Sequence, residues 1–162
     1  MIAGIMADGT VKVASQYLGK RYKEVSSWSH IVPVSYTHLD VYKRQDLPYS
    51  GLGVIGRKKE IKYNSSPESI KSLQKLQRQI LEASIPYLKK GGRLVYSTCT
   101  VTKEENVEQV KWLMNNFSLK PVDLTELVPK RFRTETTGMG YVQVLQGVMD
   151  CDGFFVSAFT RG

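Results

Sequence analysis

The chain has 162 residues, of which 41% are hydrophobic and 23% are charged, a composition typical of one soluble domain with a sizeable core. No apolar run approaches the roughly 18 residues of a membrane helix, and the amino terminus lacks a signal-peptide pattern. Two cysteines do not make a disulfide framework, which predicts a reducing, cytoplasmic setting. The net charge of +8 favours a polyanionic partner, although many basic proteins bind no nucleic acid.

Residues 1–33 contain no recognisable motif, and we assign them no function. The alternation of Thr10–Ala14 is compatible with a short strand. The next segment, 34–45, can be encoded by a DNA that is its own reverse complement once the last two bases of a Pro33 codon are added. It looks like two transposon ends joined during sequencing-library preparation, so we interpret it as an artefactual junction and residues 1–33 as foreign sequence. The alternative is a chance match in an ordinary linker.

From Asp46 onward the sequence predicts regular elements. Asp46–Ile55 is a loop rich in Pro, Gly and Ser. Ser66-Pro67-Glu68 begins a helix with an N-cap and a first-turn proline, and the apolar residues after it recur at helical spacing up to the Gly91-Gly92 turn. Leu94–Tyr96 then reads as a buried strand.

A second helix is expected after Thr102–Glu105, which matches a capping box. Its buried residues are expected to be Val107, Val110, Met114 and Phe117. Strands are predicted at 119–124, 141–145 and 154–159, the last two as a closing hairpin with Phe154 and Phe155 in the core. The alternation of helix and strand predicts an α/β fold with parallel strands.

Cys99 follows the predicted strand directly. In open α/β sheets ligands bind beyond the carboxyl ends of the strands, so a catalytic thiol is expected at this position. A lone cysteine at a strand end is more often a small buried hydrophobe. Cys151 has no surrounding motif and is expected to have no chemical function, and His38 lies in the suspected junction. No set of His, Cys, Asp and Glu has metal-ligand spacing.

Several motifs in order resemble the RsmB/Sun type of RNA cytosine C5-methyltransferase, over about residues 46–161. They are Asp46–Ile55, Lys59–Tyr63, Leu94–Thr100, Glu104–Asn106 and Asp152–Phe155. The resemblance implies the carboxyl-terminal half of a Rossmann-like methyltransferase domain that uses S-adenosylmethionine and acts on RNA, with small-subunit ribosomal RNA as the expected substrate.

The resemblance also implies functions for individual residues. Cys99 corresponds to the nucleophile that adds to C6 of cytosine. Asp46 corresponds to the family acid that lies between the cofactor and the base, and it is the expected cofactor-binding residue. The basic residues Lys58, Lys59, Lys130 and Arg131 are candidate RNA contacts, although such residues are more often a solvated surface.

Two departures from the family pattern limit this interpretation. The family loop reads Asp-Ala-Pro-Cys-Ser-Gly, and Tyr49 stands where its second cysteine, associated with product release, would be. The glycine-rich cofactor loop and the acid for the ribose hydroxyls are not found in residues 1–45, although a doubly wound fold divides its cofactor site between both halves. The alternative is therefore a truncated, chimeric chain without activity, at most a weak basic RNA-binding module.

Overall fold

The computed structural model describes residues 2–5, 11–14, 47–148 and 150–162. Asp46 and the suspected junction at 34–45 lie outside the described residues. The described residues include Val11–Ala14 and, from Leu47 onward, all of the predicted helices and strands apart from Met149.

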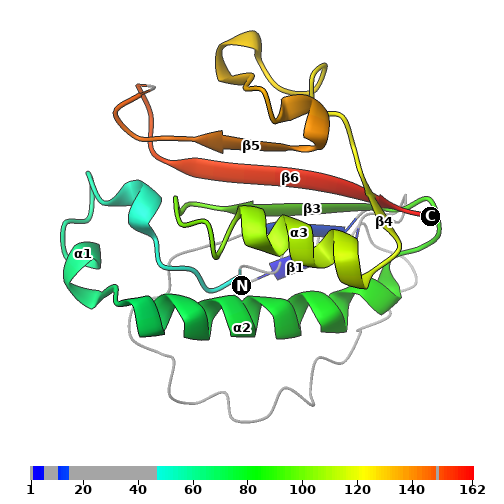
Figure 1. Cartoon of the computed structure of the whole chain (residues 1–162), viewed down its shortest axis with the longest axis horizontal. Helices are drawn as coiled ribbons and strands as arrows, with labels where there is room; N and C mark the ends of the chain where they lie inside the picture. Colours follow the sequence, from blue (N-terminus) through cyan, green and yellow to red (C-terminus); the bar gives the residue numbers. More distant parts are fainter. Residues whose placement is uncertain (1, 6–10, 15–46, 149) are drawn as a thin grey trace.

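A six-stranded sheet forms the centre of the described fold (Figure 1). Its strands are β1 (Ile2–Ile5), β2 (Val11–Ala14), β3 (Arg93–Thr98), β4 (Leu119–Pro121), β5 (Tyr141–Val144) and β6 (Phe154–Arg161). The order is β1-β2-β3-β6-β4, and β5 also pairs with β6. The predicted strand near Thr10–Ala14 and the closing hairpin of β5 and β6 are confirmed.

Among the described strands, the expectation of parallel pairing holds for one pair. β2 and β3 are parallel, whereas β6 is antiparallel to β3, β4 and β5. β3 and β4 run in the same direction, as the helix between them requires, but β6 is inserted between them. Along its other edge β6 pairs with β5 through residues 154–157 and with β4 through residues 159–161.

The long helix α2 (Pro67–Ser84) begins where the sequence predicts. The hydroxyl of Ser66 accepts from the amide of Ser69 at 3.1 Å, and the hydroxyl of Ser69 accepts from the amide of Ser66 at 2.9 Å. This reciprocal cap satisfies two donors that the first helical turn cannot use. The other helical segments are η2 (Leu52–Val54), α1 (Ile61–Asn64), η3 (Ile85–Tyr87), α3 (Val107–Asn116), η4 (Lys130–Phe132) and η5 (Thr137–Met139).

Helices α2 and α3 cover one face of the sheet (Figure 1). On that face Leu94 and Tyr96 of β3 lie opposite Phe159 and Ser157 of β6, as the period of two in a strand dictates. The core between sheet and helices includes Leu47, Ile80, Leu81, Leu94, Tyr96, Val110, Leu113, Phe155 and Phe159. A second, smaller core lies on the opposite face, where Leu124, Val142, Val144 and Ala158 pack together.

Three predictions about α3 and β6 were wrong. Met114 is 43% exposed, and Leu113 is the buried residue on that turn of α3. Phe154 is 39% exposed because neighbouring residues of a strand face opposite sides, and only Phe155 enters the core. The capping box at Thr102–Glu105 does not form, since α3 begins after Asn106 and the Glu105 side chain points into the interior. No helix in the described part of the chain is long and apolar enough to cross a membrane.

Tyr96 offers a test of this core. Its buried hydroxyl donates to the carbonyl oxygen of Glu105, and burial, followed by the nearby Glu105 carboxylate, raises the pKa of the phenol well above its ordinary value. In the unfolded chain this phenol begins to ionise at about pH 10. Because its pKa is higher in the folded state, the contribution of Tyr96 to the free energy of unfolding is fully present below that pH and is lost as the pH rises toward the folded-state pKa.

We therefore expect the free energy of unfolding to fall above about pH 10, by up to about 1.4 kcal/mol per pH unit from this group. Tyr96→Phe should reduce that alkaline slope and cost about 1–3 kcal/mol at neutral pH, because it leaves a buried carbonyl without its donor. Urea unfolding between pH 7 and 11 measures both effects. Tyr63→Phe is the control, since Tyr63 is 78% exposed, and an equal alkaline slope in both variants would contradict the assignment.

Candidate active site at the carboxyl end of β3

Cys99 lies directly after the last residue of β3, and its thiol is free and partly exposed. Figure 1 shows this end of β3 on the same side of the molecule as η2, α1 and the turn that joins β5 to β6. The predicted position of the thiol beyond a strand end is therefore the observed one. Cys151, by contrast, is exposed in the turn between β5 and β6.

The loop that follows residue 46 lies against Cys99. The amide of Gly53 donates to the carbonyl oxygen of Cys99 at 3.1 Å, and the amide of Gly153 donates to the carbonyl oxygen of Gly53 at 2.7 Å. A β-carbon on Gly53 would lie 2.3 Å from the Gly153 carbonyl oxygen and 2.8 Å from that of Cys99. The three backbones therefore meet at a distance that only glycine allows.

Asn106 fixes the residues on both sides of the thiol. Its side-chain oxygen accepts from the hydroxyl of Thr98 at 2.6 Å, and its amide nitrogen donates to the carbonyl oxygen of Thr100 at 3.0 Å. The same nitrogen donates to Gln143 of β5 at 2.7 Å. Because Asn106 is fully buried, these bonds are shielded from water, and Cys99 is presented from a backbone that is held at both neighbours.

Glu105 joins the loop to the rest of the site. Its buried carboxylate accepts from the amide of Ser50 at 2.9 Å and from the Ser50 hydroxyl at 2.6 Å. It also accepts from Gln77 of α2 at 3.0 Å and from Thr102 at 2.8 Å. No salt bridge to Glu105 is found among the described residues, so hydrogen bonds compensate for its burial.

Gln77 extends this network into the helices. It donates to the carbonyl oxygen of Pro48 at 2.9 Å and accepts from Gln109 of α3 at 2.8 Å. Glu105, Asn106, Gly53 and Gly153 lie within the motifs that carry the family resemblance but were not predicted as site residues, and Gln77 lies outside those motifs. One signal was present for Gln77, because a glutamine stands on the apolar stripe of α2, where it requires buried partners.

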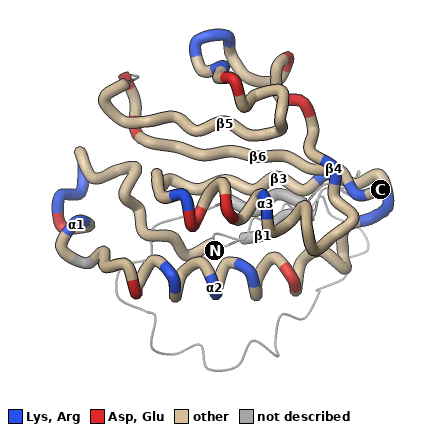
Figure 2. The backbone as a smooth tube through the Cα atoms, viewed as in Figure 1, with Lys and Arg blue, Asp and Glu red and all other residues tan. Residues whose placement is uncertain are grey.

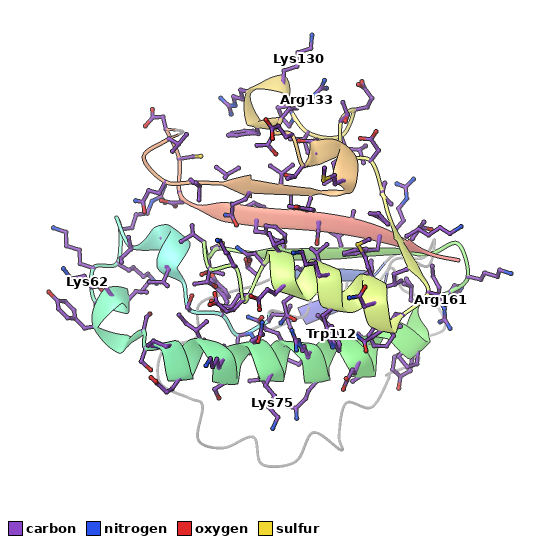
Figure 3. The ribbon with its side chains drawn as sticks, in the orientation of Figure 1. Lys62, Lys75, Trp112, Lys130, Arg133 and Arg161 are labelled. Carbon is purple, nitrogen blue, oxygen red and sulfur yellow. The ribbon has the colours of Figure 1, made fainter. Side chains whose placement is uncertain are left out.

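The candidate RNA contacts do not form one surface. Lys58 and Lys59 lie between η2 and α1, near the Cys99 end of the sheet, whereas Lys130 and Arg131 lie on η4. Figure 3 shows Lys62, beside the first pair, and Lys130 on well-separated parts of the molecule. Any RNA contact by all four would need a ligand that spans both regions. Within the described residues no group of His, Cys, Asp and Glu could hold a metal ion.

Comparison with known proteins identifies the family. The sequence profile described as 16S rRNA methyltransferase RsmB/F matches residues 2–160. The chain belongs to this family. Ribosomal RNA small subunit methyltransferase F from Cronobacter sakazakii is 35% identical over 118 residues, and the protein of that name from Salmonella agona is 37% identical over the same length. Both matches cover 72% of the chain and 24% of the relative, so the chain spans about a quarter of the length of these curated relatives.

Solved structures agree on the fold. The crystal structure of PH0851 superposes with a TM-score of 0.63 at 27% identity, covering 72% of the chain and 26% of that protein. NSun6 from Pyrococcus horikoshii with SFG gives a TM-score of 0.58 at 24% identity, covering 70% of the chain and 28% of that protein. The prediction of a partial Rossmann-like methyltransferase domain is confirmed. The family match extends to residue 2, while the separate origin of residues 1–33 stays a prediction.

Gly53→Ala tests the contact between the loop and Cys99. The added methyl group meets two backbone carbonyl oxygens, so the loop must move, and we expect a loss of about 1–3 kcal/mol in unfolding free energy. The rate at which an alkylating reagent modifies Cys99, measured with Cys151→Ser in both proteins, should also change.

Gly138→Ala is the matched control, because nothing lies within 4 Å of its added β-carbon. It should change the unfolding free energy by less than about 0.5 kcal/mol. Equal stability and equal Cys99 reactivity in the two variants would show that the close approach of Gly53 to Cys99 does not constrain the site.

Proposed function

We propose that Cys99 is the covalent nucleophile of an RNA cytosine C5-methyltransferase that acts on small-subunit ribosomal RNA and takes its methyl group from S-adenosylmethionine. The observation that carries this proposal is the partly exposed thiol at the carboxyl end of β3, held between two fixed neighbours and beside the 47–54 loop. Membership of the RsmB/F family and the names of the relatives support RNA as the substrate.

The chemistry explains why the site needs a thiol. C5 of cytosine is a poor nucleophile, and attack of the Cys99 thiolate on C6 forms an S–C6 bond while the C5=C6 π electrons become available at C5. After C5 has been methylated, loss of the C5 proton to a base restores the double bond and expels the thiolate. The enzyme thus divides one difficult substitution into easier steps. The target base must leave its stack to reach the thiol.

Asp46 is the proposed partner of Cys99. A carboxyl group at the N3/N4 edge of the cytosine would hold the base and favour the adduct by hydrogen bonding. The residues immediately after Asp46 support such a position, since Leu47 is buried, Gln77 binds the carbonyl oxygen of Pro48, and Gly53 binds Cys99. This part of the loop is rigidly connected to the strand that presents the thiol.

The methyl donor fits the site only in part. S-adenosylmethionine would supply an electrophilic methyl group on a sulfonium centre, and the solved relative with SFG, an analogue of that molecule, supports its use. In the described part of the loop, the amide and the hydroxyl of Ser50 are already bonded to Glu105. Asp46 is therefore the residue proposed to face the donor, and Lys58, Lys59, Lys130 and Arg131 remain proposed RNA contacts.

The nucleophile assignment predicts a covalent product. A protein that contains these residues with a complete cofactor site should form a stable adduct with RNA carrying 5-fluorocytosine, because fluorine at C5 cannot leave as a proton. Cys99→Ala should abolish the adduct and lower methyl transfer at least about 10³-fold, the range expected when a nucleophile is lost. Denaturing gel electrophoresis and transfer of labelled methyl groups measure the two effects.

Cys151→Ser is the control for that experiment, because Cys151 is exposed and outside the site. It should leave both adduct and transfer unchanged. Undiminished transfer by Cys99→Ala would remove Cys99 from the nucleophile position. An adduct that forms with ordinary cytosine and persists would instead indicate slow release, as expected if Tyr49 cannot replace the family cysteine.

The alternative function is RNA binding without methyl transfer by the 162-residue chain itself. It is favoured by the match to only 24% of the length of the curated relatives and by the lack of a glycine-rich cofactor loop in residues 1–45. Under this alternative, titration calorimetry of the chain with S-adenosylmethionine should give no measurable heat of binding. Micromolar binding would contradict the alternative and support activity of the chain alone.

A further inference from the structure

A second group of cations lies at the end of the sheet opposite Cys99. Its members are Lys89, Lys90, Arg93, Lys120 and Arg161. Figure 2 shows Lys and Arg gathered around the carboxyl terminus and β4, and Figure 3 shows Arg161 on the opposite side of the molecule from Lys62. β3 runs from Arg93 to the residue before Cys99, and at about 3.3 Å per residue this separates the group from the thiol by roughly 20 Å.

The fold brings these cations together from three separate segments. Arg93 of β3 lies opposite Thr160 of β6, which lies opposite Lys120 of β4. The three residues form one row across adjacent strands, so Arg93 and Lys120 project from the same face about 10 Å apart. Exposed Lys89 and Lys90 precede β3, in a turn closed by a bond from the Gly92 amide to the Lys89 carbonyl oxygen at 2.8 Å.

Arg161 has a structural function within the group. Its guanidinium donates to the carbonyl oxygens of Leu88 at 2.5 Å and Ile85 at 3.3 Å, and its backbone is bonded to Gly91 and Gly92. It therefore fixes the Lys89–Lys90 turn against β6. Lys89, Lys90, Arg93 and Lys120 are exposed, which leaves their charges available to a ligand.

Acidic residues are absent from these segments. Residues 85–93, 118–122 and 158–162 contain no Asp or Glu, and the nearest along the chain are Glu82 and Asp123, with the terminal carboxylate at Gly162. Other cations have acidic partners nearby, as in the ion pairs of Arg57 with Asp152 at 3.1 Å and of Arg133 with Glu126 at 3.9 Å. Among the described residues, none of the four exposed cations Lys89, Lys90, Arg93 and Lys120 forms an ion pair, so the described acids leave the positive charge of the group in place.

An exposed aromatic side chain adjoins the lysines. Tyr87 is the last residue of η3, two positions before Lys89, and it is 45% exposed. Surfaces that bind single-stranded nucleic acid have two components. Cations contact the phosphate backbone, and aromatic rings stack on the bases. The ring beside the cations offers a base a surface to stack on, which is why we take nucleic acid as the ligand.

We propose that Lys89, Lys90, Arg93, Lys120 and Tyr87 form a second RNA-binding surface, which holds unpaired RNA several nucleotides away from the base presented to Cys99. The inference rests on the proposed function only in taking RNA as the partner. The surface contributes affinity and placement, and it takes no part in the chemistry, because it lies at the opposite end of β3.

The test compares two fourfold variants of the 162-residue chain with equal net charge. In the first, Lys89, Lys90, Arg93 and Lys120 are changed to Gln; in the second, the exposed lysines Lys71, Lys75, Lys103 and Lys111 are changed to Gln. Fluorescence anisotropy with a labelled single-stranded RNA measures affinity across a series of salt concentrations. Circular dichroism and thermal unfolding show whether each variant is folded.

We expect the first variant to lose at least about tenfold in affinity at low salt, and the slope of log K against log salt to become shallower by about 3, as for the loss of four phosphate contacts. The second variant should show much smaller changes. Tyr87→Leu should weaken binding at every salt concentration without changing the slope, because stacking releases no counterions. If the fourfold variant does not fold, Lys89→Gln with Lys90→Gln, which alters no strand, should give about half the slope change.

Equal losses in the two fourfold variants would overturn the inference, since net charge alone would then explain binding. Failure of the unchanged chain to bind RNA would overturn the inference, whereas the proposed function is tested separately by the adduct and methyl-transfer experiment with Cys99→Ala. Selective loss of binding by the first variant would support the inference even if that experiment removed Cys99 from the nucleophile position.

Discussion

The carboxylate of Glu105 is the group on which the site depends. A buried carboxylate is stable only when hydrogen bonds replace its water, and here the donors come from Ser50, Gln77 and Thr102. These belong to the loop after residue 46, to α2 and to the segment after Cys99. Because the Glu105 carboxylate needs donors from all three segments, none of these segments can move without leaving the carboxylate poorly solvated. Removing the Glu105 carboxylate would leave several buried donors unpaired, and the resulting loss of folding free energy exceeds what the hydrogen bonds themselves contribute.

This constraint has a direct consequence for the thiol. Cys99 is in a short connection, a kind of segment that is ordinarily mobile. Here Asn106 binds Thr98 and Thr100, and Gly53 binds the Cys99 carbonyl oxygen, so the backbone is fixed while the side chain remains partly exposed. A nucleophile held in this way pays little entropy when a base arrives, and preorganisation of this kind is a major source of catalytic rate.

Local features were predictable from the sequence, whereas distant pairings were not. Ser66-Pro67 marks the start of α2 by capping chemistry, and Leu94–Tyr96 marks β3 by its apolar run, so both were correctly placed. The insertion of β6 between β3 and β4 depends on contacts some sixty residues apart, as between Tyr96 and Ser157, which no local pattern reports. The prediction of Glu105 as a capping residue was wrong because its side chain binds Ser50, which lies 55 positions earlier in the chain. The local motif does not report such a distant partner.

The distribution of charge follows from the same architecture. β3 carries Arg93 at its exposed amino end and presents Cys99 at the other, and it is rigid because it lies between β2 and β6 with Leu94 and Tyr96 in the core. A polyanion bound at the amino end of such a strand is held at a fixed distance from the thiol. Lys58 and Lys59 lie between η2 and α1, at the Cys99 end of the sheet, so an RNA that touches both ends would be placed along the strand by contacts to its phosphate backbone. Such contacts set position without reading sequence, and the choice of base is then left to the groups that surround Cys99.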